Sequence, residues 1–365
     1  MLDKRKIREI SEDLQKRGID AFLLGPGDDL EYLCGLKTGE CERFKGLFIL
    51  ADGSYFCITP HLYLEEFEAA FGSEAPIYVW NDKDWFYPVL AKAMNDFNLN
   101  DKKLAVNFGV RAVDAIEISD RQGVKLLNGW HFLERMRIIK SPSEIEKLER
   151  ATQISDAAFR ELLGFIRPGL TEGEIKKKLI ELFEEHGADG PAFDVIVARK
   201  ENASKPHYNG TKGVIEERDL VLIDFGCRYE SYCSDTTRTI FVGDPSDEEK
   251  NLYEVVLNAQ EAGEAAVRPG VLAEEVDRAA RSVIEDAGYG EYFNTRLGHG
   301  IGVAIHEAPY IMEGNKTPLE PGMTFSIEPG IYIPGKIGIR IENIVVVTDD
   351  GCRSLCKLPK DIIVI

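Results

Sequence analysis

The stretch Leu220–Arg238, LVLIDFGCRYESYCSDTTR, decides how the rest of the chain is interpreted. Its first four residues are apolar and predict a buried strand, which ends on the charged residue Asp224. A second short segment, Tyr229–Asp235, also ends on an acid. The spacing predicts two paired strands joined by a short turn, with Asp224 and Asp235 at one end of the ladder. If these carboxylates are buried at the strand ends, a cation must compensate their charge. The alternative is two solvated surface acids beside a hairpin, which require no cation.

The composition is that of a globular protein long enough for two domains. The chain has 365 residues, of which 44% are hydrophobic and 29% charged, and its net charge is −19. That charge argues against a nucleic-acid partner, because a phosphate backbone would be repelled. The charged N-terminus and the absence of a long apolar run predict a cytoplasmic protein with no membrane partner. Seven scattered cysteines are then expected to be free thiols.

The chain changes character near Ile139, where we place a domain boundary. Strand-like and helix-like segments alternate before it, which predicts an N-terminal α/β domain over residues 1–137 with its own core. Within it His61 and His131 are isolated, and we interpret them as surface or hydrogen-bonded histidines. The sequence Ser141–Glu144, SPSE, is a helix start with a capping box and proline at the first helical position. The C-terminal domain is predicted over residues 138–365.

An internal repeat runs through this second domain. Ile166–Gly169, IRPG, recurs 101 positions later as Val267–Gly270, VRPG. At the same offset Gly187 matches Gly288, and glutamates of the intervening helices match as well. The repeat predicts two similar α/β halves that face one another about a pseudo-two-fold axis, with a site in the cleft between their sheets.

A histidine and two further acids follow the second copy. Three glycines surround His299 and allow close backbone approach, and predicted strands carry Glu328 and Glu342. Together with Asp224 and Asp235 they make four carboxylates and one imidazole, a set that suits Mn²⁺, Co²⁺, Fe²⁺ or Zn²⁺. Four carboxylates in one cleft would raise one another's pKa values, and about two divalent ions would balance their charge. The pattern therefore predicts a two-metal hydrolase in which a metal-bridging hydroxide is the nucleophile.

The motifs that carry these residues resemble the proline-peptidase branch of the methionine-aminopeptidase-like, or pita-bread, metallopeptidases, which includes prolidase and aminopeptidase P. The resemblance runs from about residue 138 to the C-terminus and rests on Pro206–Tyr208, Ile223–Gly226, Ser234–Thr239, Gly298–Gly302 with His306–Glu307, Glu328–Gly330 and Arg340–Glu342. It implies a creatinase/prolidase-like α/β domain followed by a pita-bread catalytic domain. It also implies a homodimer.

The resemblance implies a metal-binding role for each acid and for the first histidine. Asp224 would bind one ion, and His299 and Glu328 the other. Asp235 and Glu342 would bridge both ions. Mn²⁺ or Co²⁺ is expected ahead of Zn²⁺ or Fe²⁺.

It also implies roles outside the metal shell. Glu328 would accept a proton from the bridging water. His207 and His306 would contact the scissile carbonyl and the tetrahedral intermediate, since an imidazole near a developing oxyanion is stabilising. Arg340 would support Glu342 or bind a substrate carboxylate. The alternative for the two histidines is a structural role.

The implied activity is hydrolysis of the bond between an N-terminal residue and proline in short peptides, as a Xaa-Pro dipeptidase or aminopeptidase. Thr295 stands where many relatives have a pocket histidine, which bears on proline preference, and Asn343 stands where an aspartate often follows the last ligand. One alternative is a metal-retaining amidohydrolase of the creatinase or ectoine-hydrolase kind. Another is a binding module without catalysis.

Overall fold

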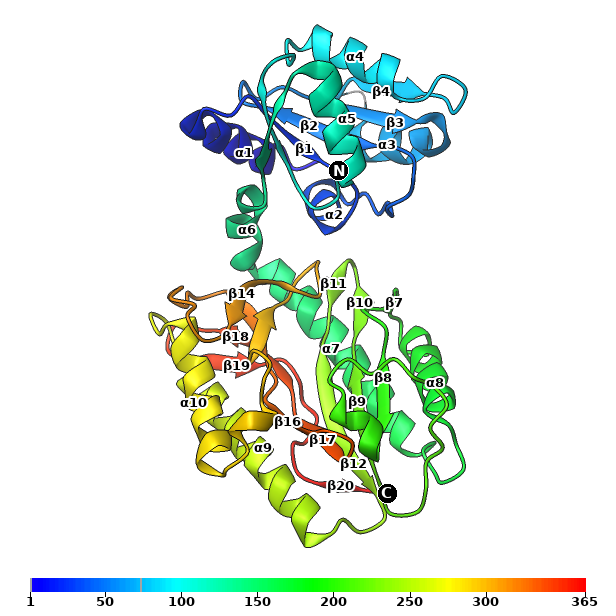
Figure 1. The fold of residues 1–365 in the computed structure, drawn as a ribbon, viewed down its shortest axis with the longest axis vertical. Helices are drawn as coiled ribbons and strands as arrows, with labels where there is room; N and C mark the ends of the chain where they lie inside the picture. Colours follow the sequence, from blue (N-terminus) through cyan, green and yellow to red (C-terminus); the bar gives the residue numbers. More distant parts are fainter. Residues whose placement is uncertain (1, 73) are drawn as a thin grey trace. The chain divides into compact units, whose positions relative to one another are not determined.

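The computed structural model describes residues 2–72 and 74–365, and the chain divides into two compact units between Met136 and Arg137. Both units mix helices and strands (Figure 1), which confirms the predicted fold class. All seven cysteines are free thiols, as expected. Among the described residues, no helix is at once long enough and apolar enough for a membrane span.

The N-terminal unit is built on one six-stranded mixed sheet. Its strand order is β4-β3-β2-β1-β5-β6. The strands are β1 (Ala21–Leu24), β2 (Gly46–Leu50), β3 (Tyr55–Pro60), β4 (Ile77–Trp80), β5 (Lys103–Val106) and β6 (Lys125–Asn128). The helices are α1 (Lys4–Arg17), α2 (Asp28–Cys34), η1 (His61–Tyr63), α3 (Leu64–Phe71), α4 (Tyr87–Asp96), α5 (Ala112–Gln122) and α6 (His131–Ile138).

Apolar cores cover both faces of this sheet. One core includes side chains of α1, α2, α3 and α6, and the other includes side chains of α4 and α5. Phe22 and Leu24 of β1 belong to the first core, while Ala21 and Leu23 belong to the second. A strand buried on both faces has an unbroken apolar run, which is why AFLL lacks polar alternation.

The C-terminal unit contains two larger sheets, of four and five strands, between pairs of helices. The helices are α7 (Pro142–Leu163), α8 (Glu172–Glu185), η2 (Lys200–Ser204), α9 (Asp247–Ala266), α10 (Ala273–Asp286) and η3 (Gly290–Tyr292). The strands are β7 (Gly190–Pro191), β8 (Ile196–Arg199), β9 (Asp219–Phe225), β10 (Cys227–Tyr229), β11 (Tyr232–Cys233), β12 (Thr236–Val242), β13 (Gly298–Gly300), β14 (Glu307–Ile311), β15 (Thr324–Ile327), β16 (Gly330–Ile333), β17 (Ile337–Arg340), β18 (Asn343–Val347), β19 (Cys352–Ser354) and β20 (Ile363–Val364).

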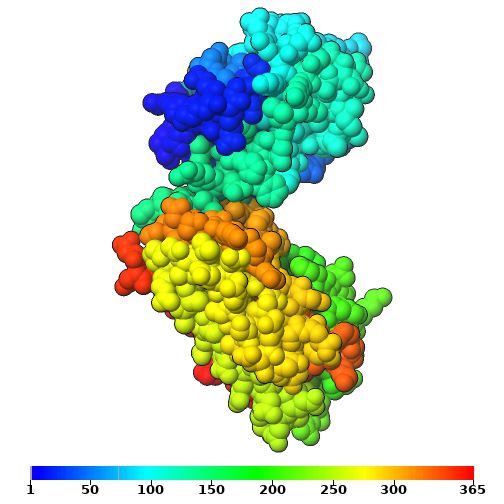
Figure 2. All heavy atoms as spheres, turned by 60° about the vertical axis from the view of Figure 1, so that its left-hand side comes forward, coloured from blue at the N-terminus to red at the C-terminus, as the bar shows by residue number. Residues whose placement is uncertain are grey.

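These sheets lie between the helix pairs. The four-stranded sheet has the order β20-β12-β9-β8, and the five-stranded sheet has the order β14-β13-β15-β18-β19. Figure 1 shows α8 along one side of the unit and α9 with α10 along the other. The residues of α9 and α10, yellow in Figure 2, form much of the face seen there.

The predicted repeat reappears as the same backbone bridge in both halves. Gly169 N–H donates to Ile215 at 2.8 Å, and Gly270 N–H donates to Leu319 at 2.8 Å. Both glycines have positive φ, at 92° and 85°, a conformation that glycine adopts without strain. In each half the bridge ties the Pro-Gly turn to a segment that follows the next helix. The matching turns therefore have matching partners.

Two details of the predicted strands are wrong. The partner of β9 is β12, which begins after Asp235, so Asp224 lies opposite Thr237. The segment between them forms the separate hairpin β10–β11. Gly226, just before this hairpin, passes close to Ser234, just after it: a Cβ on Gly226 would lie 1.9 Å from the Ser234 carbonyl oxygen. Both acids still lie at one end of the ladder.

The strand predicted to carry Glu342 is also two strands, β17 and β18. The break lies at Ile341–Glu342, between the end of β17 and the start of β18. There Glu342 N–H donates to Thr237 O of β12 at 3.1 Å. This crossing brings Glu342 against the end of β12.

Candidate active site

One cavity in the C-terminal unit brings the predicted site residues together. Its volume is about 340 Å³. All eight predicted residues line it: His207, Asp224, Asp235, His299, His306, Glu328, Arg340 and Glu342. Thr295, the noted departure from the family pattern, lines it too. Side chains that the sequence did not single out complete the lining: Phe193, Asp194, Ile196, Arg296, Ile305 and Tyr332, with Pro206 beside His207.

Strand alternation explains why Asp224 faces this cavity. Leu220 and Leu222 of β9 pack in the core beneath α9 and α10, whereas Val221 and Ile223 pack in the core beneath α7 and α8. Because successive side chains point to opposite faces, Asp224 shares the face of Leu220 and Leu222. That face is directed towards the second half of the unit.

His299 lies at the centre of the acidic cluster. Ligand atoms of Asp235, His299 and Glu342 all lie within 4.8 Å of one another, and all three residues are buried. The His299 Nε2 atom is 3.1 Å from Glu328 Oε1 and 3.6 Å from Asp235 Oδ2. Its Nδ1 atom is 3.1 Å from the Gly300 carbonyl oxygen. That contact orients the ring so that Nε2 is directed at the carboxylates, where it can bind a cation when it carries no proton.

Close backbone packing holds His299 in this position. A Cβ on Gly298 would lie 1.9 Å from Ser326 O, and one on Gly300 would lie 2.2 Å from Ala308 O. Only glycine permits such approach on both sides of one residue. The Ser326 hydroxyl also accepts from His299 N–H at 3.0 Å and donates to Glu328 Oε1 at 2.8 Å.

Arg340 supports the opposite side of the cluster. Its guanidinium donates to Asp224 Oδ2 at 2.5 Å, to Thr237 Oγ1 at 2.9 Å and to the Tyr332 hydroxyl at 2.7 Å. Thr237 Oγ1 in turn donates to Glu342 Oε2 at 2.6 Å. Arg340 thus contacts Asp224 directly and Glu342 through a threonine hydroxyl.

Two buried carboxylate oxygens indicate that the cluster suits cations. Among the described residues, Asp224 Oδ1 and Glu342 Oε1 are buried without a hydrogen-bond partner. An unpartnered buried carboxylate oxygen is costly, since its hydration is lost and nothing replaces it. Burial and neighbouring acids raise the pKa of Asp235 and of Glu342 well above their usual range. A divalent ion would compensate both costs, and the donor set of oxygens with one imidazole suits one.

Glu328 differs from the other acids. Burial pushes its pKa upward, but the hydrogen bond and charge of His299 outweigh burial and hold the pKa at about 2. Glu328 is therefore ionised at neutral pH and able to accept a proton.

His306 lies beside His299, with the ring centroids 4.2 Å apart at an interplanar angle of 84°. Burial, together with the nearby His299 and Arg296, lowers the pKa of His306 to about 4. The ring is therefore neutral near pH 7 and can donate one hydrogen bond to an oxygen in the cavity. His207 lines the same cavity from an exposed segment.

The supporting hydroxyls are the residues that sequence reasoning missed. Thr237, Ser326 and Tyr332 each contact a predicted site residue, yet a threonine, a serine and a tyrosine in strands carry no distinctive signal. The position of Thr237 inside the Ser234–Thr239 motif was the only available hint.

Comparison with known proteins identifies both units. The sequence matches metallopeptidase family M24 over residues 146–349 and the creatinase/prolidase N-terminal domain over residues 6–139. It is 36% identical to the Xaa-Pro dipeptidase of Pyrococcus horikoshii over 362 residues, 98% of each chain. The structure is similar to a prolidase from Thermococcus sibiricus, with a TM-score of 0.95 and 35% identity over 100% of both chains. It is also similar to the X-Pro aminopeptidase of Thermotoga maritima, with a TM-score of 0.87 and 35% identity over 100% of both chains. The chain therefore belongs to metallopeptidase family M24 and carries a creatinase/prolidase N-terminal domain before its catalytic domain.

Proposed function

We propose that this metallopeptidase uses two metal ions to hydrolyse the peptide bond between an N-terminal residue and proline. One observation carries the proposal: four acids and an imidazole converge on one cavity, with buried carboxylate oxygens that lack a partner among the described residues. The printed names of relatives, a Xaa-Pro dipeptidase and an X-Pro aminopeptidase, support the substrate class. Their names also leave open whether dipeptides or longer peptides are cut.

In this proposal Asp224 would hold one ion, His299 and Glu328 the other, and Asp235 and Glu342 both. The 4.8 Å cluster of Asp235, His299 and Glu342 supports the shared position. Mn²⁺ or Co²⁺ is expected ahead of Zn²⁺ or Fe²⁺, because most donors are carboxylate oxygens. Bound divalent ions would supply a hydroxide nucleophile near neutral pH and polarise the scissile carbonyl.

The remaining residues would serve the substrate and the protons. Glu328, ionised at neutral pH, would take a proton from the attacking water. Neutral His306 would donate to the developing oxyanion, and His207 would contact the same carbonyl. Arg340 would mainly hold Asp224 and Thr237, since its donors already have those partners.

Domain limits of 1–137 and 138–365 also stay our proposal. The division of the structure between Met136 and Arg137 supports them. A homodimer and a cytoplasmic location stay predictions, to be measured by sedimentation and by cell fractionation.

The test uses metal-stripped protein reconstituted with Mn²⁺ or Co²⁺. We would measure amino-acid release from a Xaa-Pro dipeptide, a Xaa-Pro-Yaa tripeptide and a Xaa-Ala dipeptide. Release from the Xaa-Pro dipeptide alone indicates a dipeptidase, and release from the tripeptide indicates an aminopeptidase. Release from the Xaa-Ala dipeptide at the same rate as from the Xaa-Pro dipeptide would show that the protein, with Thr295 in its pocket, does not prefer proline.

Asp235→Ala should abolish release, whereas Asp247→Asn, a change of a fully exposed acid, should not alter it. Metal binding without cleavage of any peptide would contradict the proposal and favour hydrolysis of another small amide. An active Asp235→Ala protein would contradict the metal assignment.

A further inference from the structure

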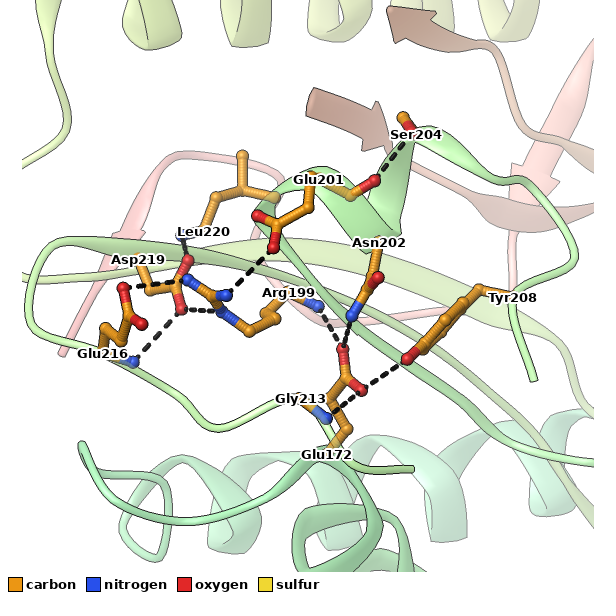
Figure 3. A network of polar contacts seen from close by, with 10 residues as sticks. All are labelled: Glu172, Arg199, Glu201, Asn202, Ser204, Tyr208, Gly213, Glu216, Asp219 and Leu220. Carbon is orange, nitrogen blue, oxygen red and sulfur yellow. Dashed lines mark hydrogen bonds and ion pairs between the residues drawn. The ribbon is translucent and has the colours of Figure 1, made fainter. Parts of the chain in front are cut away.

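Glu172 is a buried carboxylate at the start of α8 that the proposed mechanism does not use. It is 1% exposed and accepts four hydrogen bonds (Figure 3). Oε1 accepts from Arg199 N–H and Asn202 Nδ2, each at 2.9 Å. Oε2 accepts from the Tyr208 hydroxyl at 2.8 Å and from Gly213 N–H at 2.9 Å. Every donor comes from one segment, residues 199–213.

This segment carries His207, which depends on it for position. His207 is exposed and lines the cavity, and among the described residues no hydrogen bond to its ring is found. The place of the ring therefore depends on the segment that carries it and not on a hydrogen bond of its own. The adjacent residue, Tyr208, donates to Glu172 (Figure 3). Burial and this hydrogen bond raise the pKa of Tyr208 to about 12, so it remains a donor at any physiological pH.

Arg199 anchors the start of the same segment from a second direction. Its guanidinium donates to Asp219 at 2.5 Å and contacts Glu201 and Glu216 at 3.2 and 3.1 Å (Figure 3). Asp219 is 2% exposed and lies in β9. The segment is thus fixed at its first residue to β9 and along its length to Glu172.

The second half of the unit shows that the fold itself does not require this glutamate. At the repeat offset of 101 positions, Ala273 occupies the place of Glu172, and it too is the first residue of its helix. Both residues make the same backbone bridge: Glu172 N–H donates to Gly213 O at 2.8 Å, and Ala273 N–H donates to Thr317 O at 3.0 Å. An alanine is sufficient for the helix start and the bridge. A buried carboxylate with four donors is present only in the half that carries His207; in the other half the next residue, Glu274, accepts from Gly314 N–H at 3.2 Å in an exposed contact.

We propose that Glu172 is a positioning residue that holds the segment 199–213, and through it His207, at the cavity. Its two oxygens act as one anchor for four donors, and hydrogen bonds to a carboxylate are stronger than those between neutral groups. A shift of His207 by about 1 Å is sufficient to lower the rate, because catalytic groups act only in near-attack geometry. The effect on rate rests on the proposed function, whereas the anchoring of the segment does not.

The test combines a measurement of backbone order with kinetics on the full-length protein. Glu172→Gln keeps the size of the side chain but turns an NH₂ group towards two donors. Tyr208→Phe removes one hydrogen bond and is a second variant if the first folds poorly. Glu174→Gln is the matched control, since Glu174 lies on the same helical turn and, among the described residues, its side chain is hydrogen-bonded to Thr171 and not to the segment 199–213.

In hydrogen exchange, Glu172→Gln should speed exchange of the amides in 199–213 by about tenfold or more while the amides of α8 stay protected. Tyr208→Phe should have a smaller effect, and Glu174→Gln should have none. Unchanged exchange in Glu172→Gln would overturn the proposal. This readout needs no activity, so it separates failure of the anchor from failure of the proposed function.

The kinetic arm is a double-mutant cycle with His207→Ala, read as kcat/KM on a Xaa-Pro peptide. Glu172→Gln alone should lower kcat/KM by roughly ten- to a hundredfold at unchanged metal content. Added to His207→Ala it should cause little further loss, because both changes remove the same positioned ring. Additive losses would show that Glu172 acts on something other than His207 and would overturn the proposal.

Discussion

At the scale of single residues, Thr237 joins two parts of the site through one hydroxyl. It donates to Glu342 and accepts from Arg340, and it is fully buried. Outer hydrogen-bond partners of metal ligands fix the orientation of the ligand and influence its affinity for the ion.

Thr237→Val should therefore weaken metal binding by roughly ten- to a hundredfold, because Glu342 Oε2 loses the hydroxyl donor that orients it. Calorimetric titration of Mn²⁺ into the metal-stripped protein measures this. Thr236→Val is the control, since its hydroxyl donates only to the carbonyl oxygen of Asp235. An unchanged affinity in Thr237→Val would show that the hydroxyl does not orient the ligand.

Glu307, the neighbour of His306, forms a buried ion cluster. It accepts from Lys140 Nζ at 2.6 Å and from Arg137 Nη2 at 2.5 Å, and the side chains of Lys140 and Glu307 are 2% and 6% exposed. Glu307→Gln should lower the free energy of unfolding by about 3–5 kcal/mol, because it removes the carboxylate charge that the buried Lys140 ammonium contacts. Urea unfolding at pH 7 measures the loss, and Glu313→Gln on the exposed surface is the control.

The stability that Glu307 contributes depends on pH. Burial would raise the pKa of Glu307, but Lys140 and Arg137 outweigh burial and lower it below the ordinary 4.5. A lowered folded-state pKa gives stability that is fully present above about pH 4.5 and is lost as pH falls through the folded value. The difference between wild type and Glu307→Gln should therefore shrink below pH 4.5. A difference that stays constant down to pH 3 would contradict this assignment.

At the scale of elements, close contacts between strands depend on glycine. Gly298→Ala should separate β13 from β15, because the new Cβ would lie 1.9 Å from Ser326 O, a backbone atom that cannot turn aside. We expect a fall in melting temperature and a loss of metal affinity, since His299 is the next residue. Gly164→Ala is the control, because its Cβ would meet its nearest neighbour at 3.5 Å. A Gly298→Ala protein with wild-type melting and metal affinity would contradict the argument.

Irregular backbone also positions the ligands. Asp235 precedes β12, Glu328 follows β15, and Glu342 lies in the break between β17 and β18. At the end of a strand a side chain is no longer bound by the alternation of the sheet. Three of the four acids are therefore free to turn towards a common point.

At the scale of the whole molecule, each unit encloses its own apolar cores. Those of the first unit draw on residues 2–136, and those of the second on residues 138–363. All eight predicted site residues belong to the second unit.

Calorimetry should therefore resolve two unfolding transitions, and Mn²⁺ should raise only the one that belongs to the C-terminal unit. At a metal concentration 100 times Kd the added stability is about 2.7 kcal/mol. Asp235→Ala should remove the shift. If metal raised both transitions equally, the site would not belong to the C-terminal unit alone.

The sequence by itself determined much of this protein. Periodicity and capping signals predicted the helix after Ser141, and the structure has it at α7 with the capping box. The matched turns at Gly169 and Gly270 predicted the two halves, because such turns are set by local backbone conformation. The types of the ligand residues predicted the kind of chemistry, because four acids with one histidine suit few other purposes.

Only the tertiary structure decided how these parts meet. The sequence could not show that β9 pairs with β12 past a separate hairpin, or that the chain breaks at Glu342 to cross β12. Nor could it show that Glu172 holds the segment of His207. These contacts join residues far apart along the chain, and each depends on a backbone position or a hydroxyl that has no signature of its own. Local propensity fixes an element, whereas packing between elements fixes which side chains share a site.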